Sequence, residues 1–274
     1  QPKPEEKEKK KEIVILDMKR SQQINIALTK LPPVNSLKRA ILSMDNSVLE
    51  KESLERIFPL LPTVEEKTRI EEERLAYPDI PLASAEQFLL TISSVNELQS
   101  RLKLWQFSLE YETIEKDVAE PLMDLKQAID EVQRNPTFKC ILGTLLSVGN
   151  FLNGTKSKGF QLDYLAKVPE VKDTVHKQSL LYHLCTIVMD KFPESTDLYN
   201  ELGAVHRATR IDFDSQKETL KKLDDDCKKS WDYLRVIAKH ESSSSIKPRM
   251  TEFLADAGER ITILKVVCRR VINR

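Results

Sequence analysis

The sequence predicts an all-α fold, arranged as an elongated multi-helix domain, and three observations support this prediction. Glycine is rare, at 6 of 274 residues, so few positions favour tight turns. Charged residues make up 31% of the chain and hydrophobic residues 40%, and the hydrophobic residues recur three or four positions apart. No segment shows a convincing strand-like alternation. The chain is therefore expected to form long helices with solvated faces around a buried core.

The N-terminal part is predicted to be a linker followed by short helices. Residues 1–12 contain no apolar residue except proline, so we predict a disordered linker there. Residues 17–80 are expected to form a small bundle, with Ser84 as the N-cap of a further helix that ends near Ser93. Within the bundle, helices are expected over 17–31, over 47–60 and over 63–76, and another is expected to begin at Pro33. The helix over 63–76 begins with a capping-box pattern.

The rest of the chain is predicted to consist of longer helices. Pro121 is expected to kink or divide an otherwise continuous helical pattern. Residues 204–240 contain neither glycine nor proline and carry a heptad seam, which predicts one helix of roughly 50 Å and hence an elongated molecule. Three of the remaining predicted helices cover 95–134, 177–189 and 248–274. A fourth begins at Pro136 and ends in the stretch 149–154.

Composition and motifs argue against several functional classes. The 43 basic and 43 acidic residues cancel, which disfavours a nucleic-acid partner, and no apolar run is long enough to span a membrane. The four cysteines lack metal-binding spacing and are expected to be reduced and mostly buried. Gly154 and Gly159 have phosphate-loop spacing, but Phe160 replaces the required lysine. We therefore predict no catalytic residues, no metal site and no cofactor.

Three unusual surface features remain. Ile26 is apolar but lies about 200° from Ile24 around the first helix, so it is either covered by a second layer or an anchor for a partner. Gly143 and Gly149 interrupt an apolar helix, which fits either close packing within the chain or a groove for another chain. Five lysines surround an irregular loop, which is either simply solvated or a patch for an acidic protein: Lys156, Lys158, Lys167, Lys172 and Lys177.

The same places carry a family resemblance. An ordered string of motifs resembles the signature of the formin homology two domain, and the resemblance covers residues 13–274. The segment DMKRSQQINIAL at 17–28 is similar to the first helix of that domain's knob. Three short segments have sequences nearest to those of the FHOD subfamily: LPPV at 31–34, WQF at 105–107 and VKDTV at 171–175. The ordered motifs are GNFLN at 149–153, GF at 159–160, Leu162, Leu165, KDT at 172–174 and SLLYHL at 179–184.

This resemblance implies an all-helical module in the actin cytoskeleton of the cytoplasm, with a knob at about 17–80 followed by coiled-coil and post helices. Such domains form homodimers in which the N-terminal lasso of each chain wraps the post of the other. The dimer binds filament barbed ends and nucleates, caps or elongates actin. By resemblance, Ile26 and Lys172 would contact actin, and Gly149, Asn150 and Asn153 would receive the partner's lasso.

One departure and two alternatives accompany this interpretation. The family's lasso carries tryptophans, whereas this chain has only Trp105 and Trp231, so we expect it to lack the lasso and to dimerise weakly or not at all. The helical pattern alone would also fit a structural coiled-coil scaffold or bundling protein without barbed-end activity. An enzyme, such as a helical GTPase regulator, is disfavoured because neither an arginine finger nor a nucleotide site is identifiable.

Overall fold

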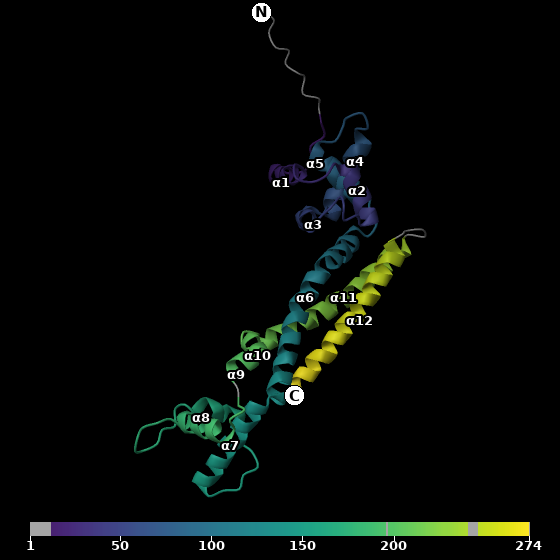
Figure 1. Cartoon of the computed structure of the whole chain (residues 1–274). Helices are drawn as coiled ribbons and strands as arrows, with labels where there is room; N and C mark the ends of the chain where they lie inside the picture. Colours follow the sequence, from purple (N-terminus) through teal and green to yellow (C-terminus); the bar gives the residue numbers. More distant parts are fainter. Residues whose placement is uncertain (1–11, 196, 241–245, 274) are drawn as a thin grey trace, which may run out of the picture. The chain divides into compact units, whose positions relative to one another are not determined.

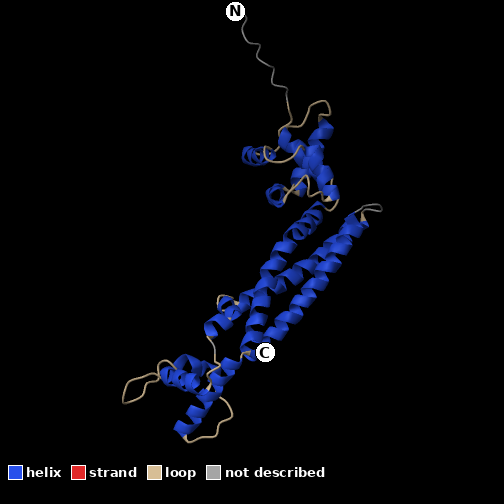
Figure 2. Cartoon of the chain, in the orientation of Figure 1, coloured by secondary structure: helices blue, strands red, loops and turns tan. Residues whose placement is uncertain are grey.

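The computed structural model describes residues 12–195, 197–240 and 246–273, and within these ranges all regular elements are helical (Figure 1, Figure 2). Extended pairing in the described residues is limited to two isolated bridges, Ile13 with Leu82 and Lys172 with Ser179. The predicted all-α class is thus confirmed. The predicted linker falls mainly on residues 1–11, which lie outside the described residues.

The chain divides into two compact units, which are described separately. Unit 1 comprises the described residues up to Asp117 together with 218–263, and unit 2 comprises 118–217 together with the residues from Leu264 onwards. Three helices contribute residues to both units: α6 (Leu98–Arg134), α11 (Phe213–Lys239) and α12 (Ile246–Ile272).

A bundle of short helices forms the first part of unit 1 (Figure 1). Its central helix is α5, which packs against α1, α2 and α4, so the bundle includes a helix beyond the predicted 17–80 range. Its core consists of fully buried aliphatic and aromatic side chains, among them Ile24, Leu37, Ile41, Leu54 and Phe88. The elements are α1 (Met18–Leu28), α2 (Val34–Ser43), α3 (Lys51–Ile57), η1 (Phe58–Leu60), α4 (Val64–Ala76) and α5 (Ser84–Ser93).

Two predicted boundaries in this bundle are wrong. The helix predicted over 47–60 is divided into α3 and the 3₁₀ turn η1, because the backbone is still extended at Glu50 and Pro59 follows the last α-helical turn. Ser84 is the first residue of α5, not its cap, and the capping position is Ala83. Ala83 remains extended because its N–H donates to the Ile13 carbonyl at 3.1 Å, a contact between residues far apart in the sequence.

The unit 1 portions of α6, α11 and α12 lie side by side as a three-helix coiled coil (Figure 1). The heptad seam predicted on α11 is confirmed at its six buried positions, Leu220, Leu223, Cys227, Ser230, Leu234 and Ile237. Tyr111 on α6 stacks edge-on against Phe253 on α12 and donates its hydroxyl hydrogen to the Ala257 carbonyl at 3.3 Å. Trp105, also on α6, is fully buried and donates to Asn46 Oδ1 at 2.6 Å, which connects the coiled coil to the short-helix bundle.

One prediction about the long helices is wrong, and one of the two alternatives at Pro121 is excluded. The helix predicted over 204–240 is interrupted, because α10 (Gly203–Ala208) ends before α11 begins at Phe213. The Asp212 carboxylate accepts the N–H groups of Asp214 and Ser215 at 3.1 and 3.2 Å, which satisfies the first free amides of α11 and starts a new helix. Pro121, by contrast, does not divide α6, which continues to Arg134 as one helix.

Unit 2 is built around two apolar helices, α7 (Pro136–Asn153) and α8 (Leu180–Lys191). Leu145, Val168, Leu184 and Val188 form their shared core. The 3₁₀ turn η2 (Leu162–Lys167) lies between them in sequence, and α9 (Leu198–Glu201) precedes α10. Glu131 on α6 accepts the Ala204 N–H at 3.0 Å, so this part of α6 fixes the start of α10.

Candidate functional site

The described residues offer little to a metal ion or a membrane. No group of three histidine, cysteine or acidic side chains among them is placed to hold a metal ion, and no helix in those ranges is both long and apolar enough to cross a bilayer. All four cysteines are free; Cys227 and Cys268 are buried as expected, whereas Cys185 is exposed. Two surface features coincide with positions that the sequence analysis singled out.

The first candidate surface is on α1, in unit 1. Asp17 caps this helix by accepting the Arg20 N–H at 2.8 Å, which sets where the helical turn begins. Ile24 is fully buried, whereas Ile26 is 67% exposed, so the offset predicted between these two isoleucines is present. Among the described residues, no second layer covers Ile26. An aliphatic side chain held in water on a fixed helix is a suitable anchor for a protein partner.

The second candidate surface is a groove in unit 2, which we call the post groove. It has a volume of about 440 Å³ and follows the C-terminal half of α7. Gly149, Asn150 and Asn153, which the family resemblance assigned to one partner-binding site, all line it. Its other lining residues are Leu145, Leu146, Val148, Leu152, Thr155, Ser157, Gly159, Phe160, Tyr164, Val171 and Leu180.

The glycines of α7 are not explained by close packing within the chain. A Cβ atom added at Gly143 or Gly149 would meet nothing within 4 Å, other than the backbone of its own helix turn and its chain neighbours. The alternative of tight intrachain packing is therefore wrong for the described residues. A glycine inside a helix costs roughly 0.5–1 kcal/mol relative to alanine, and within the described ranges no close approach to either position accounts for that cost.

Asn150 organises the loop that borders the post groove. Its Oδ1 accepts the Ser157 N–H at 2.8 Å and the Thr155 hydroxyl at 3.0 Å, while its Nδ2 donates to the Ser157 carbonyl at 2.9 Å. Gly154 ends α7 with a φ of +61°, a left-handed conformation that favours glycine. The loop is thus folded back on α7, and the neighbouring Phe151 is left 86% exposed.

In the lysine-rich loop of unit 2, Lys172 precedes Asp173, whose carboxylate accepts several hydrogen bonds and to which the sequence analysis assigned no role. The Asp173 carboxylate accepts a hydrogen bond from His183 Nε2 at 3.0 Å, and the N–H groups of Val175, His176 and Gln178 at 2.9, 2.6 and 3.0 Å. These bonds, with the His183 contact as the largest contribution, lower the pKa of Asp173 from 3.8 to about 2. Lys172 itself is exposed, as are Lys156, Lys158, Lys167 and Lys177.

The Asp173 contacts predict a loop whose order depends on pH. Because the folded-state pKa is below the unfolded value, the stabilisation is complete above pH 3.8 and is lost as the pH falls towards 2. We expect Asp173→Asn to make the amides of Val175, His176 and Gln178 exchange several-fold faster at neutral pH and to abolish the acid step, as measured by amide hydrogen exchange. Asp163→Asn, which touches none of these amides, is the control. Unchanged exchange in Asp173→Asn would contradict the assignment.

The comparisons with known proteins agree with this architecture. The family model described as Formin Homology 2 Domain matches residues 1–274. Over 97% of its length the chain is 58% identical to human FH1/FH2 domain-containing protein 3, of which it covers 19%. It is 48% identical over 95% of its length to human FH1/FH2 domain-containing protein 1, covering 22% of that protein. Over 76% of its length it is 30% identical to the Drosophila melanogaster protein diaphanous, covering 20% of it.

The chain thus spans about a fifth of the length of the curated relatives it matches. The match to the family model extends over the helices of both units, including α1 with Ile26 and the segment that carries the post groove. The identity to the first of these relatives is far above what a shared fold alone requires. This chain belongs to the formin homology 2 domain family, within the group represented by the FH1/FH2 domain-containing proteins.

Proposed function

We propose that this chain is the actin-binding module of a formin, which associates with filament barbed ends in the cytoplasmic actin cytoskeleton. As part of a complete dimer, it would nucleate, cap or processively elongate filaments without enzymatic chemistry. The exposure of Ile26 carries this proposal, because an isoleucine that is 67% exposed occupies the position where the family's knob contacts actin. The scaffold alternative explains neither this residue nor the post groove.

The test is seeded elongation of pyrene-labelled actin, in which barbed-end growth is followed with increasing concentrations of the chain. We expect a saturable change in growth rate, and no change when the barbed ends are already blocked by a capping protein. Equal effects on free and blocked ends would indicate side binding, as expected of a bundling protein. Absence of any effect at micromolar concentration would refute the proposed function.

We further propose that the post groove receives a segment of a second formin chain. Gly149 provides a position where another backbone can approach α7 without meeting a side chain, and Asn150 and Asn153 border that position. Leu145 and Phe160 make the groove apolar, which suits a partner with aromatic side chains. The partner segment would be the lasso of another formin homology 2 domain, so the dimer would be a reciprocal exchange.

Lys172 provides an electrostatic test of the actin contact. We expect Lys172→Asp to weaken barbed-end binding, because it removes an attraction to an acidic surface and adds a repulsion. The loss should shrink as salt is raised, since the screening length falls from about 10 Å at 0.1 M to about 3 Å at 1 M. Seeded elongation at several salt concentrations measures this. A penalty that is independent of salt would rule out the electrostatic explanation.

A further inference from the structure

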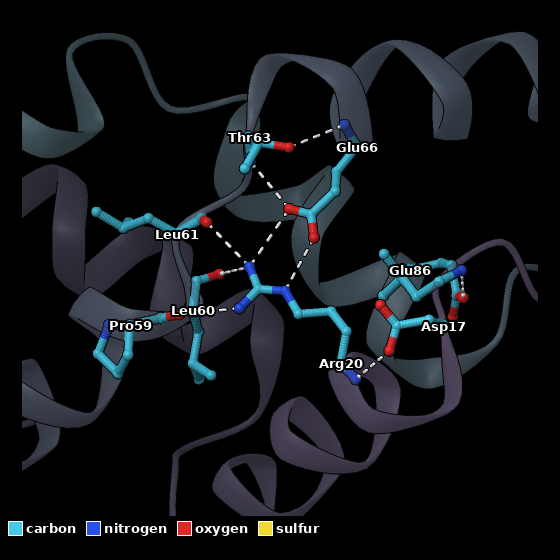
Figure 3. Close-up of polar contacts among 9 residues, drawn as sticks. Asp17, Arg20, Pro59, Leu60, Leu61, Thr63, Glu66 and Glu86 are labelled. Atoms are coloured by element: carbon cyan, nitrogen blue, oxygen red, sulfur yellow. Dashed lines mark hydrogen bonds and ion pairs between the residues drawn. The ribbon is translucent and has the colours of Figure 1, made fainter.

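We infer that Arg20 is a positioning residue for the actin contact: it clamps α1 to the rest of the bundle and so fixes where Ile26 is presented. This inference rests on the proposed function. Arg20 Nε donates to Glu66 Oε1 at 2.9 Å, and Nη2 donates to Glu66 Oε2 at 3.3 Å. Nη1 donates to the Pro59 carbonyl at 2.9 Å, and Nη2 also contacts the next two carbonyls, those of Leu60 and Leu61, at 3.4 and 3.0 Å (Figure 3).

α1 needs such a clamp because its apolar attachment is small. Of its eleven residues, Ile24 alone is buried, whereas Met18 is 77% exposed and Ile26 67% exposed. One buried isoleucine, with Ala27 and Leu28 only partly buried beside it, is a small apolar attachment for a helix that must resist the pull of a partner. The chain entering α1 is also held by polar contacts, since Glu86 Oε1 accepts the N–H groups of Ile15 and Leu16 at 3.0 and 3.1 Å.

The acceptor of the clamp is itself fixed. Glu66 is the third residue of α4 and forms a reciprocal capping box with Thr63: Glu66 Oε2 accepts the Thr63 N–H at 2.9 Å, and Thr63 Oγ1 accepts the Glu66 N–H at 3.1 Å. Burial opposes ionisation of Glu66, but the bonds from Arg20 and Thr63 outweigh it and lower the pKa of the carboxyl. Arg20 therefore joins α1 to the start of α4 and to the η1 turn through groups that are already ordered.

The geometry requires a guanidinium. The Arg20 and Glu66 side chains are only 17% and 19% exposed, so water replaces their partners poorly. A lysine offers one compact ammonium, which cannot reach both the carboxylate and three carbonyls in a planar fork. We therefore expect Arg20→Gln to release α1, and Arg20→Lys to restore only part of the effect. Arg56→Gln, at an exposed arginine of α3 that pairs with Glu52 at 3.6 Å, is the matched control.

Seeded actin elongation and amide hydrogen exchange test the inference together. If releasing α1 leaves the binding geometry populated for about a tenth of the time, the apparent Kd for barbed ends rises about tenfold. We expect that rise for Arg20→Gln, with faster exchange confined to α1 and the adjoining α4 start. In an Ile26→Ala background, Arg20→Gln should change the Kd by less than about twofold, because the two residues act through one contact.

The outcomes separate the two hypotheses. If Ile26→Ala weakens binding but Arg20→Gln leaves both binding and α1 exchange unchanged, the clamp is wrong and the proposed function stands. If the losses from Arg20→Gln and Ile26→Ala add fully, Arg20 acts on general stability or through another contact, and the inference fails. If Ile26→Ala itself leaves binding intact, the proposed contact fails, and with it any role for Arg20 in presenting it.

Discussion

Ile26→Ala is expected to weaken barbed-end binding at least about 30-fold, corresponding to about 2 kcal/mol, while leaving the helical content and the melting temperature nearly unchanged. The binding loss follows because Ile26 is the anchor that the proposed contact desolvates. The unchanged stability follows because the side chain is 67% exposed in the free protein and leaves no cavity when truncated. Seeded elongation gives the affinity, and thermal denaturation followed by circular dichroism gives the stability.

Leu75→Ala is the matched control for this result. Leu75 lies on α4 of the same bundle and is 81% exposed, so its truncation removes an equally solvated aliphatic side chain away from α1. We expect it to leave barbed-end affinity within about twofold of the unmodified chain. Equal losses from the two substitutions would mean that general surface hydrophobicity, and not a defined anchor, drives binding. A large fall in melting temperature for Ile26→Ala would contradict its exposure.

Features set by periodicity within one helix could be predicted from the sequence. The buried seam of α11 could be predicted because its residues recur three and four positions apart over many turns. The position of Ile26 off the buried stripe could be predicted for the same reason, since two residues of separation place it across the helix from Ile24. Whether a second layer covers it could not be predicted from the periodicity. Both features depend only on local backbone geometry, which the order of residues determines.

Features set by contacts between distant residues could not be predicted in this way. The start of α5 depends on the bond between Ala83 and Ile13, and the clamp of α1 depends on Glu66, 46 positions from Arg20. The capping role of Asp212 could have been recognised, because an aspartate before an amphipathic run is a common helix start. The absence of glycine and proline over residues 204–240 obscured it, because nothing in that stretch marked a break.

The post groove combines both situations. The sequence marked Gly149 as costly and left two explanations, packing within the chain or approach by another chain. The structure separates them, because there is open space where a Cβ at Gly149 would lie. The Asp173 contacts are a different case. The carboxylate oxygens of Asp173 accept hydrogen bonds from N–H groups of its own loop and from His183, ten positions away. No spacing rule predicts that a loop closes in this way.

Filling the post groove should separate binding from stability. We expect Gly149→Leu to weaken binding of a second formin chain at least about 30-fold, as for loss of an interface hot spot, because the new side chain occupies the proposed path of the partner's segment. The same substitution should not destabilise the fold. A Cβ at this position meets nothing within 4 Å, and leucine is favoured over glycine inside a helix by about 0.8 kcal/mol.

Gly143→Leu is the matched control, because it places the same side chain six residues earlier on the same helix. Gly143 also has open space around an added Cβ, yet it does not line the groove. Both variants should therefore unfold at the same or a slightly higher temperature, and only Gly149→Leu should lose binding. The probe is a labelled formin homology 2 domain of human FH1/FH2 domain-containing protein 3, extended to include the sequence before the matched region, and its binding is measured by fluorescence anisotropy.

The three possible departures have distinct meanings. If Gly149→Leu binds the probe normally, the partner's segment does not follow the groove, and the glycine requires another explanation. If Gly143→Leu loses binding equally, the contact surface covers the whole exposed side of α7 and is not confined to the groove. If Gly149→Leu lowers the melting temperature by several degrees, the space beyond the added Cβ is filled by the chain itself, and the lost binding would reflect a disturbed fold instead of a blocked site.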